Sequence, residues 1–209
     1  MKYNIVENIN PNIFRGYDIR GIYGSDLNED VAYTIGLAYA KYIKKNGYSR
    51  CVVGKDNRSS SDPLTEALIQ GIIESENIEV IDIGLVTTPM YYYAQIFLND
   101  GKNIMPGIMI TASHNPKEYN GMKISVNDFG NACGKMIEDF RDFVAKNAKE
   151  ELNNTREVKG SVTRSDIRQG YLDLVKKSIN NTTKDNVKTL VFIGLWLVLI
   201  ILFIIFFNF

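Results

Sequence analysis

The sequence predicts an α/β fold, a three-layer α/β/α domain with a mostly parallel sheet, followed by a C-terminal hydrophobic segment that resembles a transmembrane helix. Short apolar runs alternate along the chain with segments of helical hydrophobic period, which is typical of sheets whose strands are joined by helices. Glycine or polar turns separate the two kinds of segment. From residue 190 to residue 207 every residue is apolar or glycine.

The helices are placed by capping residues and hydrophobic spacing. Asn28 is a good N-cap for a first helical pattern, which ends near Gly47. Asp62 and Pro63 predict the start of a second helix, with the carboxylate as cap and proline at the first helical position. Further helices are expected at 91–97, 135–149 and 166–179.

Four buried strands are expected, at 51–53, 79–83, 108–110 and 122–126. In sheets of this class, ligands gather in the loops beyond the carboxyl ends of the strands. The segment after Ile110 is such a loop. Residues 150–164 are polar without hydrophobic period and predict a connector.

Composition narrows the function. The chain has 209 residues, and its 24 Lys and Arg balance its 24 Asp and Glu without a run of like charge. We therefore expect no nucleic-acid partner, and we predict no protein partner. Cys51 and Cys133 lack the spacing of a zinc site or a disulfide framework. The N-terminus has no apolar run of signal-peptide length, so we expect a cytoplasmic domain.

Residues 111–116, Thr-Ala-Ser-His-Asn-Pro, place a hydroxyl nucleophile in the loop after a buried strand. Small and turn-forming residues there allow close backbone approach. A Ser-His pair in a loop is nevertheless more often an ordinary turn than a catalytic site. Adjacent residues on an extended segment also point to opposite sides, so His114 need not be the base for Ser113.

Two other stretches carry charge suited to an anion. Residues 14–21, Phe-Arg-Gly-Tyr-Asp-Ile-Arg-Gly, combine two arginines with a tyrosine and an aspartate, which suits charge-assisted hydrogen bonds; the alternative is a solvated turn. Residues 120–124, Asn-Gly-Met-Lys-Ile, return the chain through a tight turn and bring Lys123 ten positions after Ser113. Lys123 is suited to neutralise phosphate charge; the alternative is an ordinary surface lysine.

Together these three stretches resemble the phosphohexomutases of the phosphoglucomutase/phosphomannomutase family. That family has the patterns FRxYDIRG, TASHNP and NGxK in this order, as this chain does. The resemblance covers about residues 12–173, including the loop 54–58 and the turn 87–89. The form of residues 17–21 looks most like the bacterial-type branch.

The resemblance implies intramolecular phosphotransfer between the 1 and 6 positions of hexose phosphates, in carbohydrate metabolism. Ser113 would carry a phosphoryl group, pass it to a hexose phosphate to give a bisphosphorylated sugar, and recover phosphate from the other position. The residues it implies for catalysis are Ser113, Arg20, Lys123 and His114, and those for substrate or phosphate binding are Tyr17 and Asn115.

The same resemblance implies Mg²⁺, bound to Ser113 through its phosphoryl group, and a hexose 1,6-bisphosphate activator. A complete member also has a DGDxDR metal loop, a GExSGH-like sugar loop and an arginine-rich phosphate loop in its later domains, and this sequence contains none of them. We therefore expect a fragment that cannot turn over alone. The alternative function is a noncatalytic, membrane-anchored domain that binds sugar phosphates.

On this resemblance, residues 1–150 form domain I, 151–189 form a connector and the start of an incomplete domain II, and 190–207 form the hydrophobic tail. As a helix, the tail would reach about 27 Å, close to the ~30 Å hydrocarbon core of a bilayer. Lys184 and Lys188 precede it, so it is a candidate membrane anchor that leaves the domain in the cytoplasm. Two origins stay open, a truncated or frame-shifted gene and a genuine tail anchor.

Overall fold

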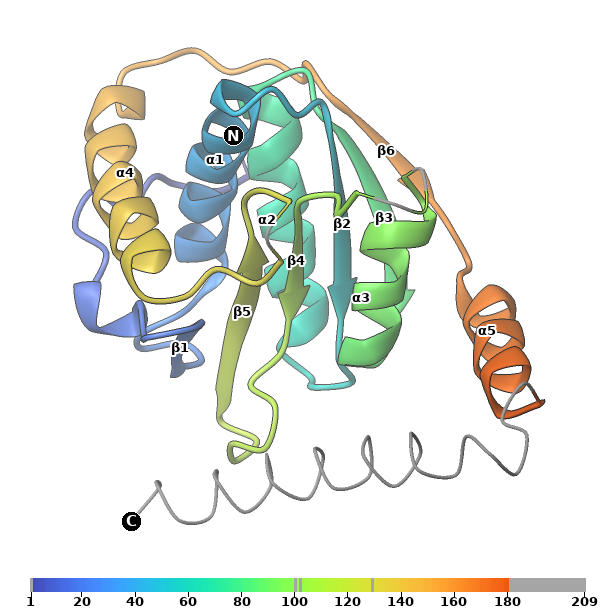
Figure 1. The fold of residues 1–209 in the computed structure, drawn as a ribbon. Helices are drawn as coiled ribbons and strands as arrows, with labels where there is room; N and C mark the ends of the chain where they lie inside the picture. The colour runs from blue at the N-terminus through green and yellow to red at the C-terminus, as the bar shows by residue number, and fades with distance from the viewer. Residues whose placement is uncertain (1, 100, 102, 129, 181–209) are drawn as a thin grey trace. The chain divides into compact units, whose positions relative to one another are not determined.

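The computed structural model describes residues 2–99, 101, 103–128 and 130–180, and their strands form one sheet in the order β1-β5-β4-β2-β3-β6 (Figure 1). Neighbours among β4, β2, β3 and β6 are parallel, whereas β5 runs antiparallel to both β4 and β1. The prediction of a mostly parallel sheet is therefore confirmed. The strands are β1 (Ile19–Ile22), β2 (Arg50–Lys55), β3 (Glu79–Leu85), β4 (Gly107–Ile110), β5 (Tyr119–Ser125) and β6 (Ser161–Arg164).

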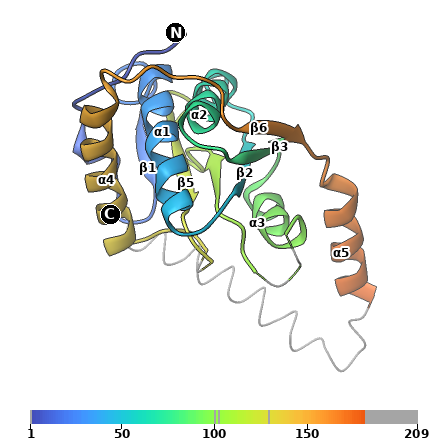
Figure 2. The same cartoon turned by 90° about the horizontal axis from the view of Figure 1, so that it is seen from above.

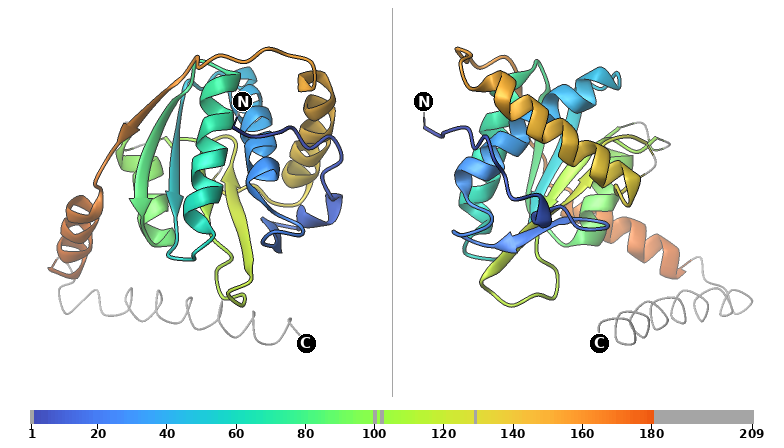
Figure 3. Two further views of the ribbon diagram at one scale, coloured as in Figure 1. Left: turned by 180° about the vertical axis from the view of Figure 1, so that it is seen from behind. Right: turned by 90° about the vertical axis from the view of Figure 1, so that its left-hand side faces the viewer.

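Helices cover both faces of this sheet (Figure 2). One face packs against α1 (Glu29–Lys45), α2 (Ser61–Ser75) and α4 (Lys135–Glu151), and the other against α3 (Thr88–Phe97). Successive residues of β2 show the division, because Val53 belongs to the first core and Val52 to the second. The three-layer α/β/α prediction is thus confirmed, and the view from behind shows the same layers (Figure 3).

The chain divides into two compact units, Met1–Ile167 and Arg168–Phe209. The first contains the sheet and its four covering helices, together with a short 3₁₀ helix, η1 (Pro11–Ile13). The described part of the second unit contains α5 (Arg168–Asn180). A helix was predicted at 166–179, in agreement with α5.

Local sequence signals placed some helix ends correctly and others not. The Asn28 side chain accepts a hydrogen bond from the Val31 amide at 3.0 Å, which confirms the predicted cap of α1. The start of α2 differs, since the helix begins at Ser61 and its N-cap is Ser60, with no capping bond from the side chain. Asp62 therefore lies inside the first turn, where a carboxylate also suits the helix dipole.

Two strands were missed. β1 is a short strand at the edge of the sheet, paired with β5, and its four residues are too few for a periodic signal. β6 lies within the predicted connector, and all four of its side chains are exposed. Backbone pairing with β3, not apolar burial, forms this strand, so the sequence carries no hydrophobic alternation there.

The prediction of a transmembrane-like helix in the fold has to be corrected. Among the residues that the structure describes, no helix is long and apolar enough to cross a membrane. The longer helices α1 and α4 have 17 residues each and carry charged residues in their first and last turns. The segment 190–207 itself lies outside the described residues.

Candidate functional site

The predicted serine loop borders a hollow of about 700 Å³ at the carboxyl ends of the parallel strands. Two loops that follow neighbouring strands form most of it, one after β2 and one after β4. The first residue of α3, Thr88, completes the lining. The lining residues are Asp56, Asn57, Arg58, Ser59, Thr88, Thr111, Ser113, His114, Asn115 and Lys117.

Ser113 occupies a strained turn in this hollow. Its φ is 57°, in the left-handed region that residues with a side chain rarely adopt, and no other described residue except glycine has a positive φ. Its amide donates to the Thr111 hydroxyl at 2.8 Å, while its side chain is exposed. Such strain persists where the surroundings enforce it, and it concentrates at functional sites.

His114 lies beside this serine without a short hydrogen bond to it. Its Nδ1 is 3.4 Å from the Ser113 Oγ, which is long for a hydrogen bond involving a hydroxyl. Both residues line the hollow.

Arg20 reaches the serine loop from β1. Its Nη1 donates to the Asn115 Oδ1 at 2.8 Å, and its Nη2 pairs with the Asp18 carboxylate. The side chains of Arg20 and Asp18 are 12% and 4% exposed, so this cation is held in place by a buried partner. Within the described part of the chain, the buried Arg20 Nε has no hydrogen-bond partner.

Lys123 and Tyr17 pair with each other near this arginine. The Lys123 ammonium lies 5.6 Å from the centroid of the Tyr17 ring, within cation–π range. Burial lowers the pKa of Lys123; nearby Asp18 opposes that shift and Arg20 adds to it. Neither Lys123 nor Tyr17 lines the hollow around Ser113. The structure therefore places Ser113, His114 and Asn115 in one hollow and joins Arg20 to Asn115. Lys123 lies near Arg20 and contacts the Tyr17 ring, outside the lining of the hollow.

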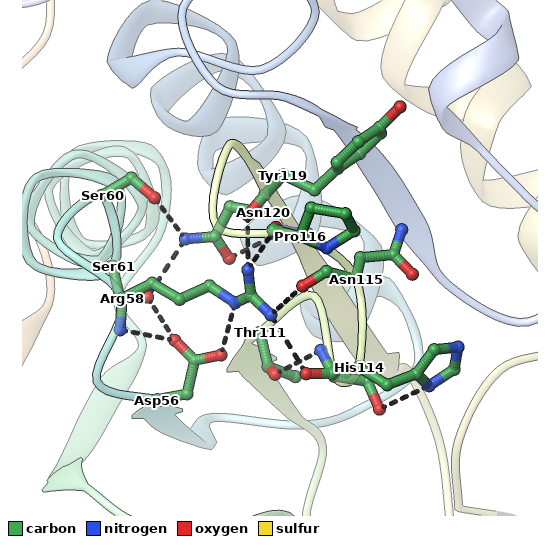
Figure 4. A network of polar contacts seen from close by, with 12 residues as sticks. Asp56, Arg58, Ser60, Ser61, Thr111, His114, Asn115, Pro116, Tyr119 and Asn120 are labelled. Atoms are coloured by element: carbon green, nitrogen blue, oxygen red, sulfur yellow. Dashed lines mark hydrogen bonds and ion pairs between the residues drawn. The ribbon is translucent and has the colours of Figure 1, made fainter.

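Arg58 is a residue of this site to which the sequence analysis gave no role. Its guanidinium donates to four backbone carbonyl oxygens, three in the loop between β4 and β5 and one on the first residue of β5 (Figure 4). The carbonyls belong to Ser113, Asn115, Pro116 and Tyr119. The available signal was the polar run 56–58, directly after β2, at the same end of the sheet as the serine loop.

Asn120 fixes the far end of the same loop. It is fully buried and donates to the hydroxyls of Ser60 and Ser61 at 2.8 and 3.0 Å, at the start of α2. Its neighbour Gly121 lies against β1, since a Cβ there would be 2.1 Å from the Ile19 carbonyl oxygen. The asparagine and the glycine of the predicted turn thus join the loop to α2 and to β1.

The described residues do not fit a metal site of their own. In the ranges 2–99, 103–128 and 130–180, no three or more His, Cys, Asp or Glu side chains gather as ligands would. The serine loop offers hydroxyl, amide and imidazole groups, which is poor in the carboxylates that Mg²⁺ prefers.

Comparisons with known proteins identify the family of this domain. A family model described as phosphoglucomutase/phosphomannomutase, alpha/beta/alpha domain I, matches residues 11–154. A phosphoglucomutase from Neisseria gonorrhoeae is 38% identical over 165 residues, which are 79% of this chain and 34% of that protein. A phosphomannomutase/phosphoglucomutase from Pseudomonas aeruginosa is 37% identical over 167 residues, 80% of this chain and 34% of the relative.

A solved structure shows the same fold. The crystal structure of a phosphoglucomutase/phosphomannomutase family protein from Burkholderia thailandensis has a TM-score of 0.66 and 31% identity, covering 79% of this chain and 35% of that one. The chain thus spans about a third of the length of these relatives. Since the family model matches well over half of the sequence, the chain belongs to the phosphoglucomutase/phosphomannomutase family, of which it contains alpha/beta/alpha domain I.

Proposed function

We propose that Ser113 is the phosphate carrier of a hexose phosphate mutase reaction, which interconverts hexose 1-phosphates and hexose 6-phosphates. The observation that supports it most is the serine itself. An exposed hydroxyl sits on a left-handed turn in a hollow, and the partly buried Arg20 is hydrogen-bonded to the same loop. The names of the relatives, phosphoglucomutase and phosphomannomutase, agree with a hexose phosphate as substrate.

The proposed chemistry is a reversible exchange of one phosphoryl group. The Ser113 oxygen attacks the phosphorus of a hexose 1,6-bisphosphate, the bond from phosphorus to the sugar oxygen breaks, and the serine proton ends on that sugar oxygen. In the reverse direction, the phosphoserine transfers its phosphoryl group to the free hydroxyl of a hexose monophosphate, which regenerates the bisphosphate and returns the proton to the serine. Because the serine can then take the phosphoryl group from the opposite position, the two steps together interconvert hexose 1-phosphates and hexose 6-phosphates. Such transfer depends mainly on positioning and on stabilising charge on the phosphoryl oxygens.

The cations of the site suit this task in different ways. Arg20 already contacts the serine loop through its hydrogen bond to Asn115, and the buried Asp18 carboxylate holds its guanidinium in place. Lys123 is partly desolvated, and this burial lowers its pKa because it disfavours the charged ammonium. A bound phosphoryl group, as a nearby anion, would offset part of that cost and favour the protonated form. We assign hydrogen bonds to the phosphoryl group to His114, Asn115 and Tyr17.

We also propose that Mg²⁺ binds through the phosphoryl oxygens on Ser113, where it would neutralise charge during transfer. The described residues include no cluster of metal ligands, so the other ligands of the Mg²⁺ would have to come from outside them. The chain spans about a third of its relatives, and complete turnover would likewise draw on the rest of such a protein. This chain would contribute the carrier serine and the cations around it.

The test is transfer of phosphate to the full chain from glucose 1,6-bisphosphate with Mg²⁺, followed by intact mass and peptide mapping. We expect one added phosphate on Ser113, absent from Ser113→Ala. Ser59→Ala is the matched control, because Ser59 is an exposed serine in the same hollow and should not change labelling. Binding of the sugar phosphate without any labelling would favour a noncatalytic binding domain instead.

A further inference from the structure

The Arg58 side chain links two loops that follow neighbouring parallel strands. Its Nη1 donates to the carbonyl oxygens of Pro116 at 2.7 Å and Tyr119 at 3.1 Å. Its Nη2 donates to those of Ser113 at 3.0 Å and Asn115 at 2.8 Å. A single planar group from one loop therefore satisfies four backbone acceptors, three in the serine loop and one at the start of β5.

A carboxylate holds this guanidinium in place. Asp56 Oδ2 accepts from the Arg58 Nε at 3.1 Å, and Asp56 Oδ1 accepts from the Ser61 hydroxyl at 2.6 Å. The Asp56 amide donates to the Ile110 carbonyl at 2.9 Å, which ties the start of one loop to the end of β4. The Arg58 and Asp56 side chains are only 13% and 19% exposed. Arg58 is thus fixed at both its Nε and its two terminal nitrogens.

The contacts with Arg58 also orient the peptide units of the serine loop. In a planar trans peptide, the carbonyl and the following amide N–H point in opposite directions. Since the Ser113 carbonyl faces Arg58, the N–H of His114 points away from it. No acceptor for that N–H is found among the described residues. Figure 4 shows the His114 ring and the Asn115 side chain on the side of the loop away from the guanidinium.

We propose that Arg58 is a positioning residue for Ser113, which acts by binding the loop's carbonyl oxygens and so keeps those partial negative charges turned away from the phosphoryl group. The proposal rests on the phosphate-carrier function proposed above. Carbonyl oxygens facing a phosphoryl group would repel it, whereas a free amide N–H can donate to it. Arg58 also supports the left-handed turn at Ser113, whose own carbonyl it binds.

Lysine cannot replace this arginine, because an ammonium is a compact point charge and lacks the planar fork that reaches four acceptors at once. Arg58→Lys therefore keeps the charge while removing the geometry. Arg141→Lys is the matched control, since Arg141 pairs with its neighbour Asp142 on the exposed side of α4. It makes the same chemical change away from the serine loop.

The experiment measures two quantities on the full chain for the wild type and both variants. Amide hydrogen exchange reports the order of residues 112–120, and the kinetics of Ser113 labelling by glucose 1,6-bisphosphate report transfer. For Arg58→Lys we expect exchange about tenfold faster in this loop alone, because the contacts that order it are lost. We expect the maximal labelling rate to fall about a hundredfold, the effect of a misplacement of about 1 Å, with the half-saturating concentration unchanged. Arg141→Lys should match the wild type in both.

Three results would overturn the proposal. Unchanged exchange with unchanged labelling removes any role for Arg58. A lower labelling rate with unchanged amide exchange in the loop means that Arg58 acts on the sugar phosphate directly. A higher half-saturating concentration of glucose 1,6-bisphosphate at an unchanged maximal rate means the same. If the wild type itself is not labelled, the carrier function fails, and the exchange comparison still decides whether Arg58 orders the loop. If Arg58→Lys does not fold, Asp56→Asn, which removes the charge that fixes Arg58, is measured in the same way.

Discussion

Gly121 sets the distance between β1 and β5, and therefore the distance between Arg20 and the serine loop. In the antiparallel register, Arg20 lies opposite Gly121. A Cβ on Gly121 would lie 2.1 Å from the Ile19 carbonyl oxygen and 3.1 Å from that of Thr111, whereas ordinary contacts begin at 3.4 Å. Gly121→Ala therefore forces β1 outward by about 1 Å, because backbone atoms on both sides leave no side chain to yield.

We expect this substitution to affect stability and transfer together. Overpacking of this kind destabilises a fold by ~1–3 kcal/mol. If Arg20 acts in transfer as proposed, displacing its guanidinium by about 1 Å should lower the labelling rate by about a hundredfold. Urea unfolding measures the first effect, and the rate of Ser113 labelling by glucose 1,6-bisphosphate, in urea-free buffer where the variant is folded, measures the second.

Gly16→Ala is the matched control. Gly16 lies in the same segment as Arg20, has no neighbour within 4 Å of an added Cβ and does not have a left-handed φ. Its substitution should change stability by less than about 0.5 kcal/mol, as is usual at open surface positions, and leave labelling unchanged. A folded Gly121→Ala variant with the stability and the labelling rate of the wild type would refute the reasoning, because it would show that β1 need not keep its position.

Three further predictions concern the same site. Burial lowers the pKa of Lys123, so between that lowered pKa and 10.5 the folded chain binds fewer protons than the unfolded chain, and the free energy of unfolding rises with pH. Lys123→Met should remove this rise in urea unfolding measured across that pH range. An unchanged slope of the free energy of unfolding against pH would count against the prediction. The hydrogen bond from Arg20 to Asn115 predicts that the effects of Arg20→Lys and Asn115→Ala on the labelling rate are coupled by ~0.5–3 kcal/mol in a double-mutant cycle. Strictly additive effects of the two substitutions would contradict this. The 209-residue chain alone should convert hexose 1-phosphate to hexose 6-phosphate at a rate near background in a coupled assay. It supplies cations around Ser113, but no group has been identified that would hold the phosphate at the other position of the sugar. Measurable turnover that Ser113→Ala abolishes would contradict this prediction.

The sequence predicted those parts of the fold that depend on local patterns. Asn28 caps its helix with its own side chain, so a short stretch of sequence contains the whole signal. The strands β2 to β5 are largely buried and read as apolar runs. β6 has no buried side chain, and only its backbone pairing with a distant strand defines it. Backbone pairing of this kind does not require a particular pattern of side chains, so the sequence does not predict it.

The candidate site divides in the same way. The motif around Ser113 was visible as a short run, and the family pattern named Arg20 and Asn115 as site residues. The hydrogen bond between these two side chains, 95 positions apart, was not predicted and depends on the pairing of β1 with β5. Arg58 was missed because its partners are backbone carbonyls 55–61 positions away, and any residue can supply a carbonyl. The roles of Lys123, Tyr17 and His114 in transfer stay predictions.

The central claim is that Ser113 both accepts and returns a phosphoryl group. The most direct measurement is a pulse and chase on the full chain, first with glucose 1,6-bisphosphate carrying labelled phosphate and then with unlabelled glucose 1-phosphate. Our account predicts that the label appears on Ser113 during the pulse and moves back to the sugar as bisphosphate during the chase. Label that never reaches Ser113, or that leaves it only as inorganic phosphate, would contradict the claim.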